Sequence, residues 1–140
     1  MLLLDNSAWS RLVVGKLPAA AAEEVAGWIE AREIVICLPF LLEAGYSARG
    51  AADHREMLDQ FELLFPRLEL SVETEERALR AQRELALRGH HRLAPADLMI
   101  AACADEAGAG VLHYDRDYDL IAAHTALAFE SVWIAPASSL

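Results

Sequence analysis

Five acidic residues stand in or beside apolar runs of this sequence. They are Asp5, Glu43, Asp97, Asp115 and Asp117. Carboxylates gathered among apolar residues repel one another, and they are costly to bury unless protons or a cation neutralise them. A ligand set made only of oxygens suits Mg²⁺, with Mn²⁺ as an alternative. If the fold brings these side chains together, we expect a divalent-metal site that can activate water for attack on a phosphodiester.

Each acid also has an ordinary structural interpretation. Asp5 could cap a helix that begins at Asn6. Glu43 could face solvent on an amphipathic helix. Asp97 stands in a first helical turn, where the helix dipole favours an acid. No single residue decides between the two interpretations, so the expected metal site depends on the whole set.

The acids after residue 114 alternate with other residues, as Asp115, Asp117 and Asp119. An EF-hand calcium loop starting at Asp115 would need a glycine and a glutamate where this chain has Leu120 and Ala126. We therefore exclude an EF-hand. Asp119 is interpreted as an ordinary acid in the first turn of a helix.

The elements that must position these acids alternate between strands and helices. Expected strands cover 2–4, 33–38, 67–70, 111–114 and 131–135, and expected helices cover 6–14, 18–32, 39–49, 51–64, 73–88, 95–107 and 117–124. This alternation predicts an α/β domain with a mainly parallel central sheet. Because the carboxyl ends of parallel strands gather at one edge, we expect Asp5 and Asp115 to face the same crevice.

The bulk composition limits the classes of protein that remain. The chain has 140 residues and a formal net charge of −10, which predicts a single domain over residues 1–140 and argues against a simple basic nucleic-acid-binding module. The acidic balance leaves a nuclease open and suits a basic protein partner. We find no membrane-length apolar run and no signal peptide, and we expect a soluble cytoplasmic protein. Cys37 and Cys103 stand in apolar runs and are expected to be buried, reduced thiols.

Four segments together resemble the PIN-domain family, and most of all its VapC-type toxins. They are Leu4–Ser7, Glu43 in its apolar helix, Ala96–Ala102 and His113–Tyr118. The resemblance covers essentially the whole chain. It implies a PIN-like three-layer α/β/α fold and a cytoplasmic, Mg²⁺-dependent endoribonuclease. It also implies a homodimer that a cognate antitoxin protein holds inactive.

The resemblance also implies roles for individual residues. The catalytic acids of the family correspond to Asp5, Glu43, Asp97 and Asp115, and the metal ligands correspond to Asp5, Asp97, Asp115 and Asp117. Ser7 matches a hydroxyl that supports the metal site. Asn6, beside the first acid, is a second candidate for supporting the site, although it departs from the commoner threonine. Tyr118 stands where phenylalanine is common. Neither departure removes an oxygen ligand.

RNA must approach an acidic protein through local contacts. The candidate phosphate contacts are Arg11, Lys16, Arg49 and Arg92, the last within a basic cluster formed with Arg88, His90 and His91. That cluster could instead be a solvated helix end. Trp9 could stack on a base, although packing in the core is the favoured interpretation. His113 is expected to be structural, because it has no metal-type partner spacing.

The same residues bear on three other functions. A phosphatase with an aspartyl nucleophile is disfavoured, because its second N-terminal acid is replaced here by Ser7. A catalytically silent interaction domain and a DNA-cleaving nuclease with the same metal chemistry remain open alternatives.

Overall fold

Four parallel strands form the central sheet, in the order β2-β1-β3-β4. Their bounds are β1 Leu2–Leu4, β2 Ile34–Val35, β3 Gly110–His113 and β4 Ser131–Trp133. The computed structural model describes residues 1–140. The central strands β1 and β3 are almost wholly buried, as expected when helices cover both faces of a parallel sheet. The predicted α/β class with a parallel sheet is confirmed.

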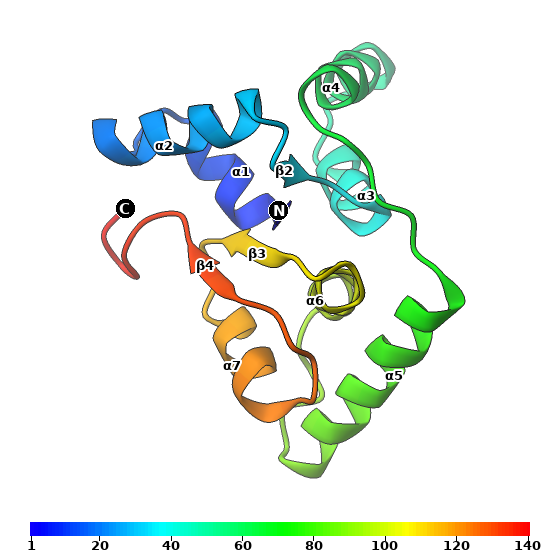
Figure 1. The fold of residues 1–140 in the computed structure, drawn as a ribbon. Helices are drawn as coiled ribbons and strands as arrows, with labels where there is room; N and C mark the ends of the chain where they lie inside the picture. Colours follow the sequence, from blue (N-terminus) through cyan, green and yellow to red (C-terminus); the bar gives the residue numbers. More distant parts are fainter.

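The chain forms seven helices around the sheet. Their bounds are α1 Asn6–Val13, α2 Ala19–Glu30, α3 Leu38–Tyr46, α4 Ala51–Leu64, α5 Val72–Leu87, α6 Pro95–Ala107 and α7 Asp117–His124. Helices α1 and α2 lie on one side of the sheet, and α5, α6 and α7 lie on the other (Figure 1). Helix α3 packs against both α1 and α6. The result is the expected α/β/α arrangement of three layers.

Helix α6 lies at the centre of the packing, between the sheet and α5. Its Ala101, Ala102 and Ala104 are fully buried, and these small side chains let the helix approach its neighbours closely. Gly108 ends α6 in the left-handed region, at φ 66°, and so turns the chain into β3. Because α6 then runs antiparallel to β3, its first turn, with Asp97, lies at the carboxyl edge of the sheet.

The prediction of a strand over 67–70 is wrong. Only an isolated parallel bridge joins Ile36 to Arg67. The backbone N–H of Ile36 donates to Pro66, and that of Leu68 donates to Ile36. The pairing extends no further, because the strand expected over 33–38 is itself short and passes into α3 at Leu38.

The start of α5 depends on residues that the sequence analysis did not single out. Ser71 caps the helix and forms a reciprocal capping box with Thr74. Both hydroxyls also donate to the carboxylate of Glu106 on α6. This polar contact joins α5 to α6 and stabilises the layer that carries Asp97.

Aromatic and sulfur-bearing residues pack as the sequence suggested. Trp9 contacts Phe61 and Phe65 in edge-to-face geometry, with ring centroids 5.2 and 5.9 Å apart. Cys37 and Cys103 are buried free thiols. None of the helices combines the length and the apolar character that a bilayer crossing requires.

Candidate metal centre

Asp5 is both a helix cap and a member of the acidic site. It directly follows β1, and its Oδ2 accepts a hydrogen bond of 2.8 Å from the backbone N–H of Ser7, which caps α1. Its side chain is buried, and the residue is only 3% exposed. The two interpretations of Asp5 are therefore compatible, because one oxygen caps the helix while the other faces the crevice.

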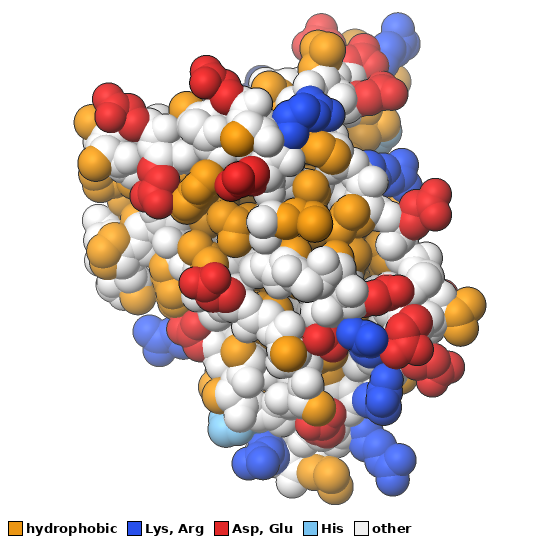
Figure 2. All heavy atoms as spheres, viewed as in Figure 1, with side chains coloured by type: hydrophobic (Ala, Val, Ile, Leu, Met, Phe, Trp, Pro, Cys, Tyr) orange, Lys and Arg blue, Asp and Glu red, His pale blue; other side chains and the backbone are white.

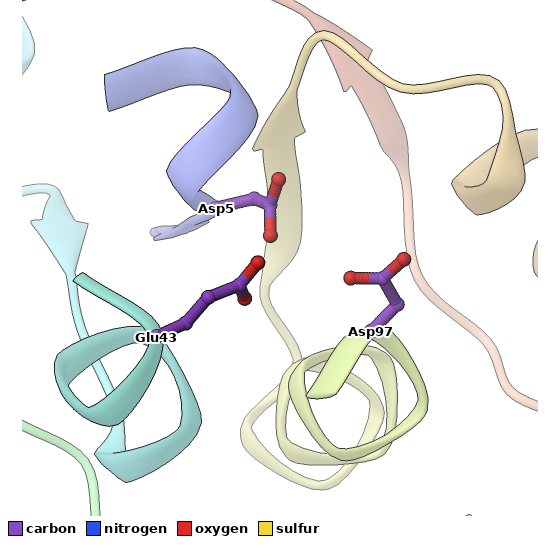
Figure 3. A group of neighbouring side chains, drawn as sticks. All are labelled: Asp5, Glu43 and Asp97. Atoms are coloured by element: carbon purple, nitrogen blue, oxygen red, sulfur yellow. The ribbon is translucent and has the colours of Figure 1, made fainter. Parts of the chain in front are cut away.

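Three elements bring Asp5, Glu43 and Asp97 together. Asp5 lies at the end of β1, Glu43 on α3 and Asp97 in the first turn of α6. Figure 3 shows their carboxylates pointing into a common space between these elements. One carboxylate oxygen from each residue lies within 4.8 Å of the others. Asp5 and Asp97 are buried, whereas Glu43 is exposed at the rim.

A second group overlaps the first. Asp97, Asp115 and Asp117 also offer oxygens within 4.8 Å of one another. Asp115 lies in the turn after β3, where its Oδ1 accepts a hydrogen bond of 3.0 Å from the backbone N–H of Asp117. Asp97 is thus shared by both groups. The structure brings together all five acids that the sequence singled out.

The crowding of these carboxylates shifts their proton affinities. Burial raises the pKa of Asp97 to about 7, and the charges of Asp5 and Asp115 act in the same direction. Partial burial, followed by the charge of Asp5, raises the pKa of Glu43. Partial burial, followed by the charge of Asp115, raises the pKa of Asp117. In each case the charged form is disfavoured, and a bound cation would reverse that preference.

No basic side chain neutralises this site. The three ion pairs of the structure involve Arg77 and Arg80 with acids of α5 and α6, outside the site. Buried carboxylates without a fixed counter-charge are costly unless they bind protons or metal. The donor set, which consists of oxygens alone, fits a hard divalent cation such as Mg²⁺ or Mn²⁺.

Hydroxyl groups hold the buried acids in place. Ser7 Oγ donates to Asp5 Oδ2 and accepts a hydrogen bond of 2.8 Å from the backbone N–H of Tyr114. It therefore ties the end of β1 to the end of β3. Asn6, the second candidate for supporting the site, donates from its side chain to the backbone carbonyl of Phe40 at 3.0 Å and so anchors α3 to α1. A hydrogen bond from the same side chain acts to lower the pKa of Glu43, against the larger effect of burial.

The sequence analysis missed the contribution of Tyr118. This side chain is fully buried. Its hydroxyl lies within hydrogen-bonding distance of Asp5 Oδ1, at 2.8 Å, and of Asp97 Oδ1, at 3.3 Å. The signal was present in the sequence, because a tyrosine stood where the family commonly has phenylalanine, but only the fold shows where its hydroxyl lies.

A groove with a volume of about 830 Å³ leads away from the acidic site between α1, α3 and α4. Its lining combines apolar and acidic side chains with a single basic one, and includes Asn6, Trp9, Glu43, Tyr46, Arg49, Asp53, Glu56 and Met57. The groove shares Asn6 and Glu43 with the surroundings of the acidic site. It is therefore an open approach to the carboxylates.

The four basic candidates occupy different surroundings. Arg49 lines the groove. Arg11 stacks on the ring of Tyr114, with its guanidinium carbon 4.6 Å from the ring centroid, and Lys16 lies with Arg11 at a separate small pocket. Arg92 is exposed in the turn before α6. Figure 2 shows basic side chains dispersed among acidic ones, without a continuous basic surface on this face.

The comparison of the chain with protein families decides its classification. A model described as the PIN domain matches residues 2–124. This chain belongs to the PIN-domain family. The conclusion agrees with the sheet order and with the acids at the carboxyl edge of the sheet.

Relatives of this PIN domain carry the VapC name. The chain is 40% identical over 143 residues to Ribonuclease VapC18 of Mycobacterium tuberculosis, an alignment that covers 98% of this chain and 97% of that protein. It is also 40% identical over 99 residues to Ribonuclease VapC51 of the same organism, covering 71% and 70% of the two chains. These relatives place it in the VapC group of the family.

Solved structures share the fold of this PIN domain. DNA-bound VapBC from Salmonella typhimurium superposes with a TM-score of 0.75 at 19% identity, covering 96% of this chain and 100% of that one. VapBC2 from Rickettsia felis, bound to a promoter DNA fragment, gives a TM-score of 0.72 at 16% identity, covering 95% and 99%. At these identities the likeness establishes the fold.

Proposed function

We propose that this protein is a metal-dependent endoribonuclease and the toxin of a toxin–antitoxin pair. One observation carries the proposal: five carboxylates converge at the carboxyl edge of the sheet without a basic counter-charge. The 40% identity to proteins named ribonucleases supports RNA as the substrate. We also propose that the protein acts in the cytoplasm.

We assign the metal to Asp5, Asp97, Asp115 and Asp117, with Mg²⁺ as the expected ion and Mn²⁺ as an alternative. When bound, such an ion polarises the scissile phosphate and lowers the pKa of a coordinated water. Asp97 belongs to both acid groups, so it could bind a cation together with the acids of either group. The catalytic set is then Asp5, Glu43, Asp97 and Asp115.

Glu43 differs from the other catalytic acids, because it is exposed while Asp5 and Asp97 are buried. A carboxylate at the rim can accept a hydrogen bond from the attacking water and orient it toward phosphorus. We therefore propose that Glu43 orients the water molecule that acts as the nucleophile. Attack by water in line with the leaving 3′ oxygen gives 5′-phosphate and 3′-hydroxyl ends.

The RNA strand would approach along the groove between α1, α3 and α4. Arg49 is its only basic lining residue and so is the first candidate for a phosphate contact. Arg11, Lys16 and Arg92 are further candidates outside this groove. Their contribution would be electrostatic and independent of base sequence.

A cognate antitoxin is the proposed protein partner. The solved neighbours are described as VapBC assemblies, which supports this expectation. Glu43, Asp53 and Glu56 outnumber Arg49 in the groove, so a basic segment of a partner would fit its charge and would compete there with RNA, whose phosphates have only Arg49 to contact. The net charge of −10 also suits a basic partner. We also propose a homodimer, which sedimentation of the purified protein would test.

The function is tested by incubating antitoxin-free protein with a total RNA pool, in Mg²⁺ and in EDTA. We expect cleavage in Mg²⁺ only, with 5′-phosphate ends that ligate directly to an adaptor. A parallel pool of single-stranded DNA separates a ribonuclease from a DNA-cleaving enzyme of the same fold. No cleavage of either pool by correctly folded protein would favour the silent interaction domain.

A further inference from the structure

A chain of polar side chains connects β4 to the turn that carries Asp115. Asp119 Oδ1 accepts a hydrogen bond of 2.6 Å from Ser131 Oγ. Ser131 Oγ in turn lies 2.6 Å from His113 Nε2. On the other side of the ring, His113 Nδ1 accepts a hydrogen bond of 3.1 Å from the backbone N–H of Asp115.

The chain of contacts determines which nitrogen of His113 carries the proton. A backbone N–H can only donate, so Nδ1 must accept and must be unprotonated. The ring proton of neutral His113 then lies on Nε2 and donates to Ser131 Oγ. The Ser131 hydroxyl is left free to donate to Asp119, which as a carboxylate can only accept. Every donor faces an acceptor in one consistent direction.

Neighbouring contacts restrict the movement of these hydrogen-bonded side chains. The second oxygen of Asp119 accepts a hydrogen bond of 3.0 Å from Trp133 Nε1. The His113 ring, which is fully buried, lies with its centroid 4.9 Å from that of Tyr118 and 5.0 Å from that of Trp133. The ring can neither turn over nor shift without disturbing both aromatic neighbours. Its Nδ1 therefore offers the Asp115 amide an acceptor at a fixed position.

We propose that Asp119 and Ser131 are positioning residues that act through His113 on the turn bearing Asp115. By fixing the His113 tautomer they hold the Asp115 backbone, and Asp115 in turn accepts from the Asp117 N–H, so both carboxylates keep one orientation toward Asp97. Their relevance to cleavage rests on the proposed function. The hydrogen-bond chain itself does not.

Packing alone does not account for these residues. An apolar side chain could fill the place of His113 in the core without requiring partners for two nitrogens. Instead, a helix-start acid and a strand serine, twelve positions apart in the sequence, satisfy the ring. His113 is buried, Ser131 is half-buried and Asp119 is exposed. A hydrogen-bond network that satisfies both nitrogens of a buried ring specifies one arrangement of that ring. Here the group at the end of the network is the Asp115 amide.

The first test is nuclear magnetic resonance of ¹⁵N-labelled, metal-free protein. We expect wild-type His113 to be the neutral tautomer protonated at Nε2. In Ser131→Ala and Asp119→Ala, the His113 nitrogen signals and the Asp115 amide signal should shift. Ser131→Thr should retain the wild-type signals, because it keeps the hydroxyl. Glu130→Ala is the matched control, since it removes a neighbouring exposed acid.

The second readout is Mn²⁺ binding, followed by electron paramagnetic resonance. Ser131→Ala and Asp119→Ala should weaken Mn²⁺ binding by about tenfold, the lower end of the effect of outer-shell mutations, while Ser131→Thr and Glu130→Ala bind like wild type. A proton on Nδ1 in the wild type, or unchanged Asp115 signals and Mn²⁺ affinity in folded Ser131→Ala, would overturn the proposal. Wild-type protein that shows the predicted tautomer and binds Mn²⁺ but leaves RNA intact would contradict only the proposed function.

Discussion

Tyr118 Oη lies 2.8 Å from Asp5 Oδ1 and 3.3 Å from Asp97 Oδ1. One hydroxyl proton therefore faces two buried acids whose charges repel. In the metal-free protein this hydrogen bond offsets part of the repulsion. In the metal-bound protein a cation would take over much of that role.

Replacement of Tyr118 by phenylalanine should therefore destabilise the metal-free protein selectively. Loss of the donor leaves a buried carboxylate oxygen without its partner, at a cost of about 1–3 kcal/mol in the free energy of unfolding. The ring packing is retained, so the cost should shrink when Mg²⁺ is added. Thermal unfolding of both proteins in EDTA and in Mg²⁺ measures the difference. An equal loss of stability in the two conditions would show that the hydroxyl does not compete with a cation.

The pH dependence of stability should follow the raised pKa of Asp97. The pKa of Asp97 in the folded protein is about 7, against an ordinary aspartate value of 3.8, so the folded metal-free protein binds this proton more tightly than the unfolded chain. The contribution of Asp97 to the free energy of unfolding is fully present below about pH 4 and is lost as the pH rises through about 7. Asp97→Asn should remove this dependence and raise the melting temperature of metal-free protein at pH 7.5 by roughly 5 °C or more.

The matched control for that experiment is Asp59→Asn, which changes an exposed acid of α4. It should leave both the melting temperature and its pH dependence unchanged. If Asp97→Asn behaved in the same way, burial would not be raising the pKa of Asp97. Calorimetric scans from pH 4 to pH 8 in EDTA provide the comparison.

Ser7 should contribute to stability through the link between two strands. Ser7→Ala removes both its hydrogen bond to Asp5 and the acceptor for the Tyr114 N–H. A partly buried N–H left without an acceptor costs about 1–3 kcal/mol. Chemical denaturation should reveal this loss. Ser10→Ala on the same helix should cost less, because the Ser10 hydroxyl donates to the Ser7 carbonyl and accepts from Arg11 Nη1, and neither contact joins two strands. Equal losses in the two variants would contradict the linking role of Ser7.

Arg49 should contribute to RNA binding through charge. Arg49→Ala in an Asp97→Asn background, which is not expected to cleave, should weaken binding of single-stranded RNA at low salt. It should also reduce the slope of log affinity against log salt by about 0.7, as expected for one lost contact to single-stranded nucleic acid. Arg83→Ala, at an exposed position of α5, serves as the control. An unchanged salt slope would indicate that RNA does not follow this groove.

The sequence predicted the features that depend on local pattern. Helix α6 was expected over 95–107 and is found there, with Asp97 in its first turn. Asp5 and Asp115 were expected at one edge because parallel strands impose it, and their carboxylates do lie in one site. The prediction of a strand at 67–70 was wrong, because an apolar pattern cannot show that its only pairing is a single bridge to Ile36, one residue beyond the two-residue strand β2.

The contacts between side chains distant in sequence were beyond prediction. Asp119 was interpreted as a helix-start acid, and it does stand in the first turn of α7. Its bonds to Ser131 and Trp133 depend on how α7 packs on β4, which spacing does not reveal. The same holds for Tyr118, whose partner Asp5 is 113 positions away. His113 was expected to be structural, and its buried ring and hydrogen bonds agree with that expectation.

The central claim is that the convergent acids form a divalent-metal site, and calorimetric titration of metal-free protein with Mn²⁺ at pH 6.5 tests it most directly. We predict saturable binding by wild type and by Asp59→Asn, with release of protons because the metal displaces the proton that Asp97 partly holds at this pH. Asp97→Asn should bind at least about tenfold more weakly and release fewer protons. Equal Mn²⁺ affinity and proton release in wild type and Asp97→Asn would contradict the account.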